Sequence, residues 1–267
     1  MRTVTDKEVC VITGASKGIG RECAELFSNN GFKVYNLSRT PSELDGVTDI
    51  SCDVTDEESV KCALGSVDEA EGRIDVVIAN AGFGISGAVE FTDDADARRQ
   101  FDVNFFGVFH TVKNSVPYLR KTKGRVIAVS SAAAIFSIPF QSFYSASKSA
   151  VASLMCAAAN EVRSFGIQAG YVQLGDVKTS FTSSRKKDHK GDDIYGGVIS
   201  RSVEKMERDE QGGMSPVTVA KRIYRLAKKR KMPLKTTVGA SYKFLVFLSK
   251  ILPLSLQNFI IGKMYMK

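Results

Sequence analysis

The stretch Val9-Cys10-Val11-Ile12-Thr13-Gly14-Ala15-Ser16-Lys17-Gly18-Ile19-Gly20 decides the fold. Its first five residues are apolar or β-branched, which is typical of a fully buried parallel strand. A glycine-rich turn follows, and residues 21–27 then have a helical pattern. This order places backbone N–H groups and the positive end of a helix where a pyrophosphate binds. The glycine spacing departs from the general dinucleotide-binding pattern, so a purely structural turn is the alternative.

Further strands and helices alternate along the chain, about two dozen residues apart. This alternation predicts a single α/β domain over residues 1–267, of the Rossmann type. We expect a doubly wound parallel sheet of about seven strands with helices on both faces. The expected strands after the first span 32–37, 49–54, 74–79, 124–131 and 167–174, and the expected helices include 56–70, 95–118 and the segment after 144. Ligands of such sheets bind at the carboxyl ends of the strands.

The composition is that of an ordinary globular protein, with 43% hydrophobic and 25% charged residues. The five cysteines are scattered without metal-binding spacing, and the chain has two histidines, so we expect reduced thiols and no metal site. No signal-peptide pattern opens the chain, and a cytoplasmic location is expected.

The formal net charge is +8, with basic runs at 185–187 and 228–231. Such runs either meet nucleic acid or anionic lipid, or form a solvated surface. Because no nucleic-acid-binding motif accompanies them, we expect no nucleic-acid partner.

Two late segments have no strand pattern. Residues 180–240 are expected to form a substrate lid and a late helix, because 180–213 is polar and irregular. Residues 241–267 are expected to form a hydrophobic, helical C-terminal extension. Lys250 and Pro253 interrupt it, which excludes a transmembrane span. Two short helices that cover the site or pack on a neighbour are favoured over peripheral contact with a membrane.

Tyr144 and Lys148 are four residues apart within a run of helix formers, which places a phenol and an ammonium on one helix face. A nearby cation lowers the pKa of a phenol toward the range useful for acid–base catalysis. Such pairs also occur by chance on solvated helices. A catalytic interpretation of this pair therefore depends on the other motifs in the sequence.

Other polar residues lie at the carboxyl edge of the expected sheet. Arg39, just after the second strand, and Lys17 favour a 2′-phosphate and hence NADP(H), with a plain surface Arg as the alternative. Asp53 is expected to accept from the adenine amino group. Asn104 is flanked by phenylalanines and is expected to be buried with partners. Ser131 ends the fifth strand, 13 residues before Tyr144.

Taken together, five elements resemble the short-chain dehydrogenase/reductase family over about residues 9–179. These elements are Thr13-Gly14-Ala15-Ser16-Lys17-Gly18-Ile19-Gly20, Asn80-Ala81-Gly82, Asn104, Ser131 and Tyr144-Ser145-Ala146-Ser147-Lys148. The residues around Gly82 and Pro139 and the apolar tail resemble the hydroxysteroid and retinol dehydrogenase branch. Two positions depart from the family pattern, since Ala79 replaces an Asn and Leu174 replaces a Pro.

The resemblance implies a catalytic set of Asn104, Ser131, Tyr144 and Lys148. Tyr144 would donate the proton, Lys148 would lower its pKa and hold the nicotinamide ribose, and Ser131 would bind the carbonyl. Asn104 would anchor a water in the proton relay. The implied cofactor-binding residues are Gly14, Ser16, Lys17, Gly18, Ile19, Gly20, Ser38, Arg39, Thr40, Asp53, Val54, Asn80, Ala81, Gly82, Tyr144, Lys148, Gly175, Val177 and Thr179.

The expected function is that of an NADPH-dependent oxidoreductase that interconverts a ketone or aldehyde and an alcohol, on a lipophilic substrate such as a steroid, retinoid or acyl compound. The expected substrate residues are Phe83, Ser131, Phe136, Phe140 and Phe143, although the aromatic ones are equally consistent with a core. The alternatives are a non-catalytic NADP(H)-binding sensor or scaffold, and a reductase of a small polar carbonyl. The resemblance also suggests a homodimer or homotetramer, formed partly through the helices after Phe101 and Ser145.

Overall fold

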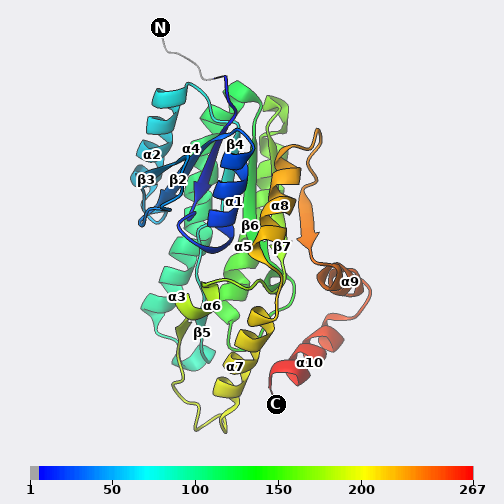
Figure 1. The fold of residues 1–267 in the computed structure, drawn as a ribbon. Helices are drawn as coiled ribbons and strands as arrows, with labels where there is room; N and C mark the ends of the chain where they lie inside the picture. The colour runs from blue at the N-terminus through cyan, green and yellow to red at the C-terminus, as the bar shows by residue number, and fades with distance from the viewer. Residues whose placement is uncertain (1–5, 267) are drawn as a thin grey trace.

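A seven-stranded parallel sheet forms the centre of the computed structural model, which describes residues 6–266 (Figure 1). The strand order is β3-β2-β1-β4-β6-β7-β9. Strands β2 and β3 are added on one side of β1, and the later strands, from β4 onward, are added on its other side. The strands are β1 (Val9–Thr13), β2 (Lys33–Ser38), β3 (Val47–Ser51), β4 (Val76–Ala79), β6 (Arg125–Ser131), β7 (Gln168–Leu174) and β9 (Lys235–Val238). The predicted Rossmann-type sheet is confirmed.

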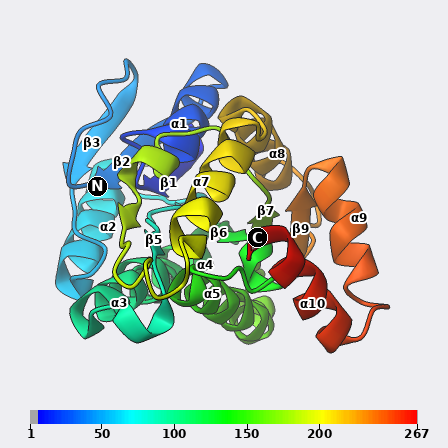
Figure 2. The same ribbon diagram turned by 90° about the horizontal axis from the view of Figure 1, so that it is seen from below.

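Helices cover both faces of the sheet (Figure 2). Alternate residues of β1 point to opposite faces, as the two-residue period of a strand requires. Val9 and Val11 pack in one core with Leu64 of α2 and Met155 of α5, whereas Ile12 packs in the other core. The second core contains side chains of α1 and α8. These helices are α1 (Gly18–Asn29), α2 (Glu57–Glu71), α4 (Gly107–Thr122), α5 (Ser142–Glu161) and α8 (Pro216–Ala227).

The helix expected over 95–118 is present, and the sequence analysis missed a π-helical turn inside it. The structure divides this region into α3 (Asp94–Phe101), a π-helical turn (Asp102–Phe106) and α4. Single π turns inside helices are rare and are frequent at functional sites. Asn104 lies within this turn and is fully buried.

The segment expected as a lid and late helix, 180–240, contributes to several parts of the fold. Its late part belongs to the core, because α8 packs against α1 and β9 is the seventh strand of the sheet. Its early part lies at the carboxyl edge of the sheet and contains α6 (Phe181–Ser184), β8 (Lys186–Lys187) and α7 (Val198–Gln211). Strand β8 pairs in parallel with β5 (Ile85–Ser86).

The C-terminal extension forms two short helices, α9 (Ala240–Leu248) and α10 (Leu254–Tyr265). In both views they lie at the side of the molecule, next to β9 (Figures 1 and 2). Within residues 6–266, no helix combines the length and apolar character needed to cross a membrane. Short 3₁₀ turns span Val89–Phe91, Ala132–Ala134 and Arg163–Phe165.

Candidate active site

A cavity of about 1100 Å³ opens at the carboxyl ends of β1, β2, β4, β6 and β7. Its lining includes the glycine-rich turn, the segment after β2, the turn after β4 and side chains of α5. The far wall comes from α9 and α10. This is the sheet edge at which ligands of parallel α/β proteins bind.

The glycine-rich turn is shaped as a cradle for a bound group. Gly14 has φ 70° and Gly18 has φ 58°, in the left-handed region that favours glycine. A Cβ on Gly14 would lie 3.0 Å from Cα of Ala81. The Asn80 amide donates to the carbonyl of Gly14 at 3.0 Å and so ties the turn after β4 to it. The helix that starts at this turn presents its N-terminus to the cavity, which suits a pyrophosphate.

Replacing Gly20 with Ala is expected to destabilise this cradle. A Cβ there would lie 2.4 Å from the Gly14 oxygen and 2.5 Å from the Asn80 amide nitrogen. Such overpacking costs about 1–3 kcal/mol, so the urea midpoint and the affinity for a dinucleotide should both fall. Gly65→Ala is the matched control, because a Cβ on that helical glycine would make only an ordinary contact, 3.7 Å from the Tyr118 hydroxyl oxygen, and the variant should gain about 0.5–1 kcal/mol. Equal stability of the two variants would contradict the close packing of Gly14 and Asn80 against Gly20.

The residues expected at the adenosine end of the cofactor line one end of the cavity. Burial alone would raise the pKa of Asp53, but hydrogen bonds from Thr55 and the charges of Arg39 and Arg99 outweigh it and lower that pKa. Arg39 is exposed. Lys17 is also exposed, and its Nζ donates to Ser184 Oγ of α6 at 2.8 Å. Lys17 therefore joins the glycine turn to α6.

Tyr144, Lys148 and Ser131 come together at the middle of the cavity. Helix α5 places Nζ of Lys148 5.8 Å from the centroid of the Tyr144 ring. Lys148 also donates to the Val129 carbonyl at 3.0 Å, which fixes its side chain against β6. Ser131, at the end of β6, hydrogen-bonds with the Tyr144 side chain. A hydroxyl, a phenol and an ammonium therefore face one space.

Burial controls the ionisation of this pair. It raises the pKa of Tyr144 to about 12, despite the opposing hydrogen bond with Ser131. It lowers the pKa of Lys148 to about 8. Desolvation of the phenolate is the largest effect on the Tyr144 pKa. The lowering of that pKa by Lys148 remains a prediction. At neutral pH Tyr144 holds its proton, as a proton donor must.

The side-chain amide of Asn104 forms hydrogen bonds within the protein. Its Oδ1 accepts from the Phe83 N–H at 3.0 Å, and its Nδ2 donates to the Phe83 carbonyl at 3.0 Å and to Ser147 Oγ at 3.2 Å. The side chain thereby fixes the chain after Gly82 against α5. The water-anchoring role remains a prediction.

Two of the four expected substrate phenylalanines line the cavity, Phe83 and Phe136. Phe140 and Phe143 are not among the lining residues, and those two expectations were wrong. Phe140 is buried in a separate core against α7. An aromatic that the sequence analysis missed, Phe181, lines the cavity with its ring centroid 5.6 Å from that of Tyr144.

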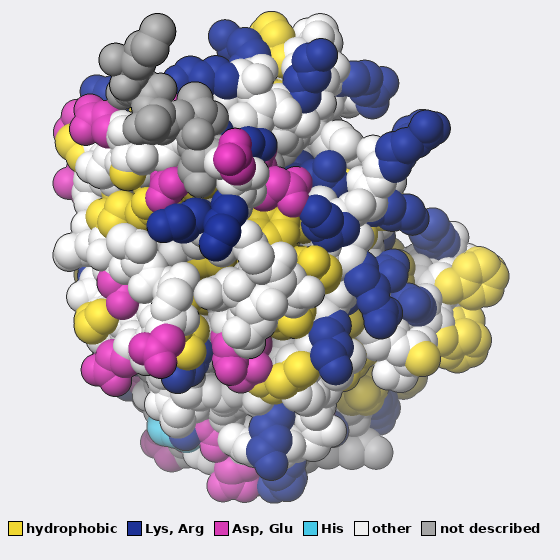
Figure 3. Space-filling view, turned by 45° about the horizontal axis from the view of Figure 1, so that its top comes forward, with side chains coloured by type: hydrophobic (Ala, Val, Ile, Leu, Met, Phe, Trp, Pro, Cys, Tyr) yellow, Lys and Arg dark blue, Asp and Glu magenta, His cyan; other side chains and the backbone are white. Residues whose placement is uncertain are grey.

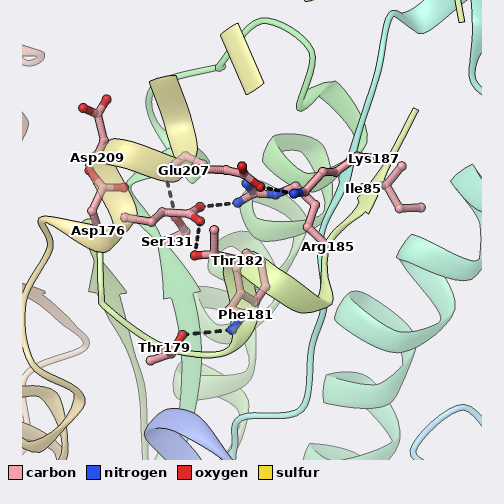
Figure 4. Close-up of polar contacts among 12 residues, drawn as sticks. Ile85, Ser131, Asp176, Thr179, Phe181, Thr182, Arg185, Lys187, Glu207 and Asp209 are labelled. Carbon is pink, nitrogen blue, oxygen red and sulfur yellow. Dashed lines mark hydrogen bonds and ion pairs between the residues drawn. The ribbon is translucent and has the colours of Figure 1, made fainter. Parts of the chain in front are cut away.

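Ion pairs connect the segment of α6 and β8 to α7 (Figure 4). The Arg185 side chain is fully buried and pairs with Glu210 of α7, which also accepts from Thr182 Oγ1 at 2.6 Å. Lys187 pairs with Glu207. Thr179 Oγ1 accepts from the Phe181 N–H at 3.2 Å, which sets the start of α6. The mobility of this segment remains a prediction.

The wall formed by α9 and α10 is mostly apolar. Its aliphatic lining residues are Leu245, Leu248, Leu252, Ile260, Ile261 and Met264. The Tyr242 ring lies on Gly175, where a Cβ would come within 1.9 Å of the ring. Tyr242 also donates a hydrogen bond to Asp176. Gly175 therefore admits the tyrosine that anchors α9 to the cavity.

No group of three or more His, Cys, Asp and Glu side chains suited to a metal ion occurs within residues 6–266. All five cysteines are free thiols.

A parallel sheet with a glycine cradle and a Tyr–Lys–Ser centre defines a dinucleotide-binding oxidoreductase. The comparisons agree, because the model of the short chain dehydrogenase family matches residues 8–190. The 3-ketodihydrosphingosine reductase of Bacteroides thetaiotaomicron is 38% identical over 247 residues, or 91% of this chain and 92% of the relative. The chain therefore belongs to the short-chain dehydrogenase/reductase family.

Solved structures show the same fold. A short-chain dehydrogenase from Streptomyces avermitilis has a TM-score of 0.83 and 26% identity, and the match covers 93% of this chain and 94% of that one. ElxO with NADP bound has a TM-score of 0.75 and 26% identity, with 89% and 99% covered. The protein is thus an oxidoreductase of this family with a nicotinamide cofactor.

Proposed function

We propose that this protein is an NADPH-dependent reductase that interconverts a lipophilic ketone or aldehyde and its alcohol. The observation that carries the proposal is a single cavity that has Tyr144, Ser131 and Lys148 at its centre and an apolar wall from α9 and α10. Buried apolar area is the main source of affinity for such a substrate. The relative that is named for the reduction of 3-ketodihydrosphingosine, a lipid ketone, supports this substrate class.

The residues present fit a nicotinamide dinucleotide, because the glycine cradle has room only for backbone next to the N-terminus of α1. When bound, this cofactor would supply the hydride that reduces the carbonyl carbon. Tyr144 donates its phenolic proton to the carbonyl oxygen, which completes the alcohol and leaves a phenolate. Ser131 donates a hydrogen bond to the same oxygen. The Lys148 ammonium stabilises the phenolate as it forms, and Asn104 positions the chain at Phe83.

NADPH is proposed over NADH because Arg39 follows β2 where an NAD-specific fold has a carboxylate. The bound NADP of ElxO supports this choice. We expect Arg39→Glu to lower kcat/KM for NADPH by about tenfold to a hundredfold, since a charge-assisted phosphate contact is lost and repulsion is gained. Steady-state kinetics with both cofactors measure this effect. Arg98→Glu, on exposed α3, is the control and should leave the cofactor preference unchanged.

The reaction is tested by following NADPH oxidation against apolar carbonyls (steroid, retinoid and long-chain ketones) and small polar ones. Turnover of an apolar class is the expected result. Preference for small polar carbonyls would support that alternative reductase instead. NADPH binding without any turnover would support a sensor or scaffold.

Self-association is proposed through α4 and α5, with a homodimer or homotetramer as the product. Phe106, beside the start of α4, is 44% exposed and available for such packing. Light scattering of the purified protein should give two or four times the chain mass of 29.1 kDa. A monomer would contradict this proposal without touching the catalytic one.

A further inference from the structure

Helices α9 and α10 and the turn between them also carry large apolar side chains that do not line the cavity. Five of these large side chains are strongly exposed, from 58% for Phe247 to 75% for Leu254. Phe244, Phe247 and Ile251 recur at helical spacing, offset from the cavity-lining residues of the same segment. Exposed apolar patches of this kind mark interaction sites. We call Phe244, Phe247, Ile251, Leu254 and Phe259 the outer face.

The charge of the chain is segregated along the sequence. All 29 acidic residues lie before residue 211, together with 25 of the 37 basic residues. Residues 211–267 contain twelve Lys and Arg residues and no carboxylate side chain. The part of the chain that carries the outer face is therefore uniformly positive. Figure 3 shows dark blue side chains gathered beside yellow ones on the right-hand side of the molecule.

A shallow basic groove of about 380 Å³ adjoins the outer face. Four cations line it, and Phe247 of the outer face lies at its edge. The lining cations are Arg222, Lys235, Lys243 and Lys250. No acidic side chain is among its lining residues. The Lys250 charge adds to partial burial in lowering the pKa of Lys235, so the two ammonium groups repel each other. A bound anion would relieve this repulsion.

We propose that the outer face and the basic groove dock the protein on a lipid bilayer with anionic headgroups. The apolar side chains enter the boundary between headgroups and acyl chains, and the four cations bind headgroup phosphates. Binding to a membrane interface strengthens with the buried apolar area and with electrostatic attraction to anionic lipids, and this surface offers both. Each Lys or Arg close to an anionic surface adds about 1 kcal/mol.

The charges favour a membrane over a second copy of the chain as the occupant. An isologous contact of two outer faces would bring two uniformly positive segments together. Like charges oppose such an interface. An anionic bilayer offers complementary charge and an apolar interior at the same surface.

Docking in this way has a consequence for catalysis, which rests on the proposed function. Other side chains of α9 and α10 line the cavity, so the bilayer and the cavity would meet the same two short helices. Docking would therefore hold the cavity next to the membrane that contains a lipophilic ketone. The protein would then act on membrane-borne substrate.

Vesicle sedimentation of the full chain tests the proposal without any activity measurement. We expect binding to vesicles of phosphatidylcholine with phosphatidylglycerol, weak binding to phosphatidylcholine alone, and loss of binding at high salt. The triple variant Phe244→Gln, Ile251→Gln, Phe259→Gln should bind at least tenfold more weakly. Its matched control is Val89→Gln with Ile194→Gln, two exposed apolar residues outside the C-terminal helices.

The headgroup step is tested separately. Lys243→Gln with Lys250→Gln should weaken binding to the anionic vesicles by about tenfold, whereas Lys61→Gln with Lys113→Gln, on α2 and α4, should not. Absence of vesicle binding, or equal binding to neutral and anionic vesicles, would overturn the proposal. Dimerisation that the outer-face variant abolishes, without vesicle binding, would assign the surface to a second copy instead.

Substrate delivery has its own readout. The outer-face variant should lose turnover of a vesicle-borne ketone and keep turnover of a water-soluble one. If wild-type protein binds vesicles but reduces neither ketone, docking stands and the proposed function fails.

Discussion

Tyr144→Phe is expected to lower kcat for carbonyl reduction by about 10²–10⁴-fold, the usual contribution of a positioned general acid. The change removes only the phenolic oxygen. The ring keeps its place beside Phe181, 5.6 Å away between centroids. Ser131 keeps its other partners, the Ala133 N–H at 3.1 Å and the Leu174 carbonyl at 3.5 Å. The affinity for NADPH should therefore change little.

The measurement is NADPH oxidation under saturating substrate, with cofactor affinity followed by fluorescence. Tyr195→Phe is the matched control, because it removes a hydroxyl that binds Glu90 outside the cavity. A Tyr144→Phe enzyme as active as the Tyr195→Phe enzyme would remove Tyr144 from the mechanism.

Lys148→Met is expected to abolish most activity and yet stabilise the fold. Burial lowers the pKa of Lys148 from 10.5 to about 8, so at neutral pH the folded state carries a costly buried charge. Met has a similar length and needs no hydration. Allowing for the lost hydrogen bond to the Val129 carbonyl, we expect a net gain of about 1–2 kcal/mol in the free energy of unfolding. Urea denaturation measures it.

The pH dependence gives the sign of this effect. Below pH 8 both folded and unfolded chains hold the Lys148 proton, and the full penalty is present. Between pH 8 and 10.5 the unfolded state binds more protons, so wild-type stability from this group rises with pH. The advantage of Lys148→Met should therefore shrink over that range. If the stability gain of Lys148→Met were independent of pH, or if the variant were less stable than wild type at pH 7, burial of the Lys148 ammonium would not destabilise the folded state.

The sequence predicted the centre of the fold because each early strand is a short apolar run that ends in a turn signal. Thr13 and Gly14 mark the end of β1, and Ser131 ends β6. The seventh strand was not placed because Lys235–Val238 is a short and mostly polar sequence. Half of its residues are buried, but this burial comes from packing against neighbouring elements and leaves no apolar run in the sequence. The π turn around Asn104 was missed because its residues continue the helical spacing of α3 and α4.

The candidate site was predicted best where backbone geometry requires a particular residue. Gly14 and Gly20 are set by close approaches of the chain, and Tyr144 and Lys148 are set by one helix face. Aromatic residues carried no such signal. Phe140 and Phe181 look alike in the sequence, but one packs in a core and the other lines the cavity, because tertiary contacts decide the direction of a side chain.

Cavity-lining residues far along the chain were the hardest to predict. The apolar tail was recognised, but the division of α9 into an inner side with Leu245 and an outer side with Phe244 depends on where β9 places the helix. Burial of Lys148, which determines its pKa, also requires the packed structure.

The most direct test of the proposed function is kcat/KM of wild-type protein with NADPH over a series of ketones that differ only in alkyl-chain length. We predict a rise of about threefold to fourfold per methylene, since each buried methylene contributes about 0.8 kcal/mol, until the chain fills the apolar wall. The Tyr144→Phe enzyme should be slow across the whole series. A flat or falling dependence on chain length would contradict a lipophilic substrate.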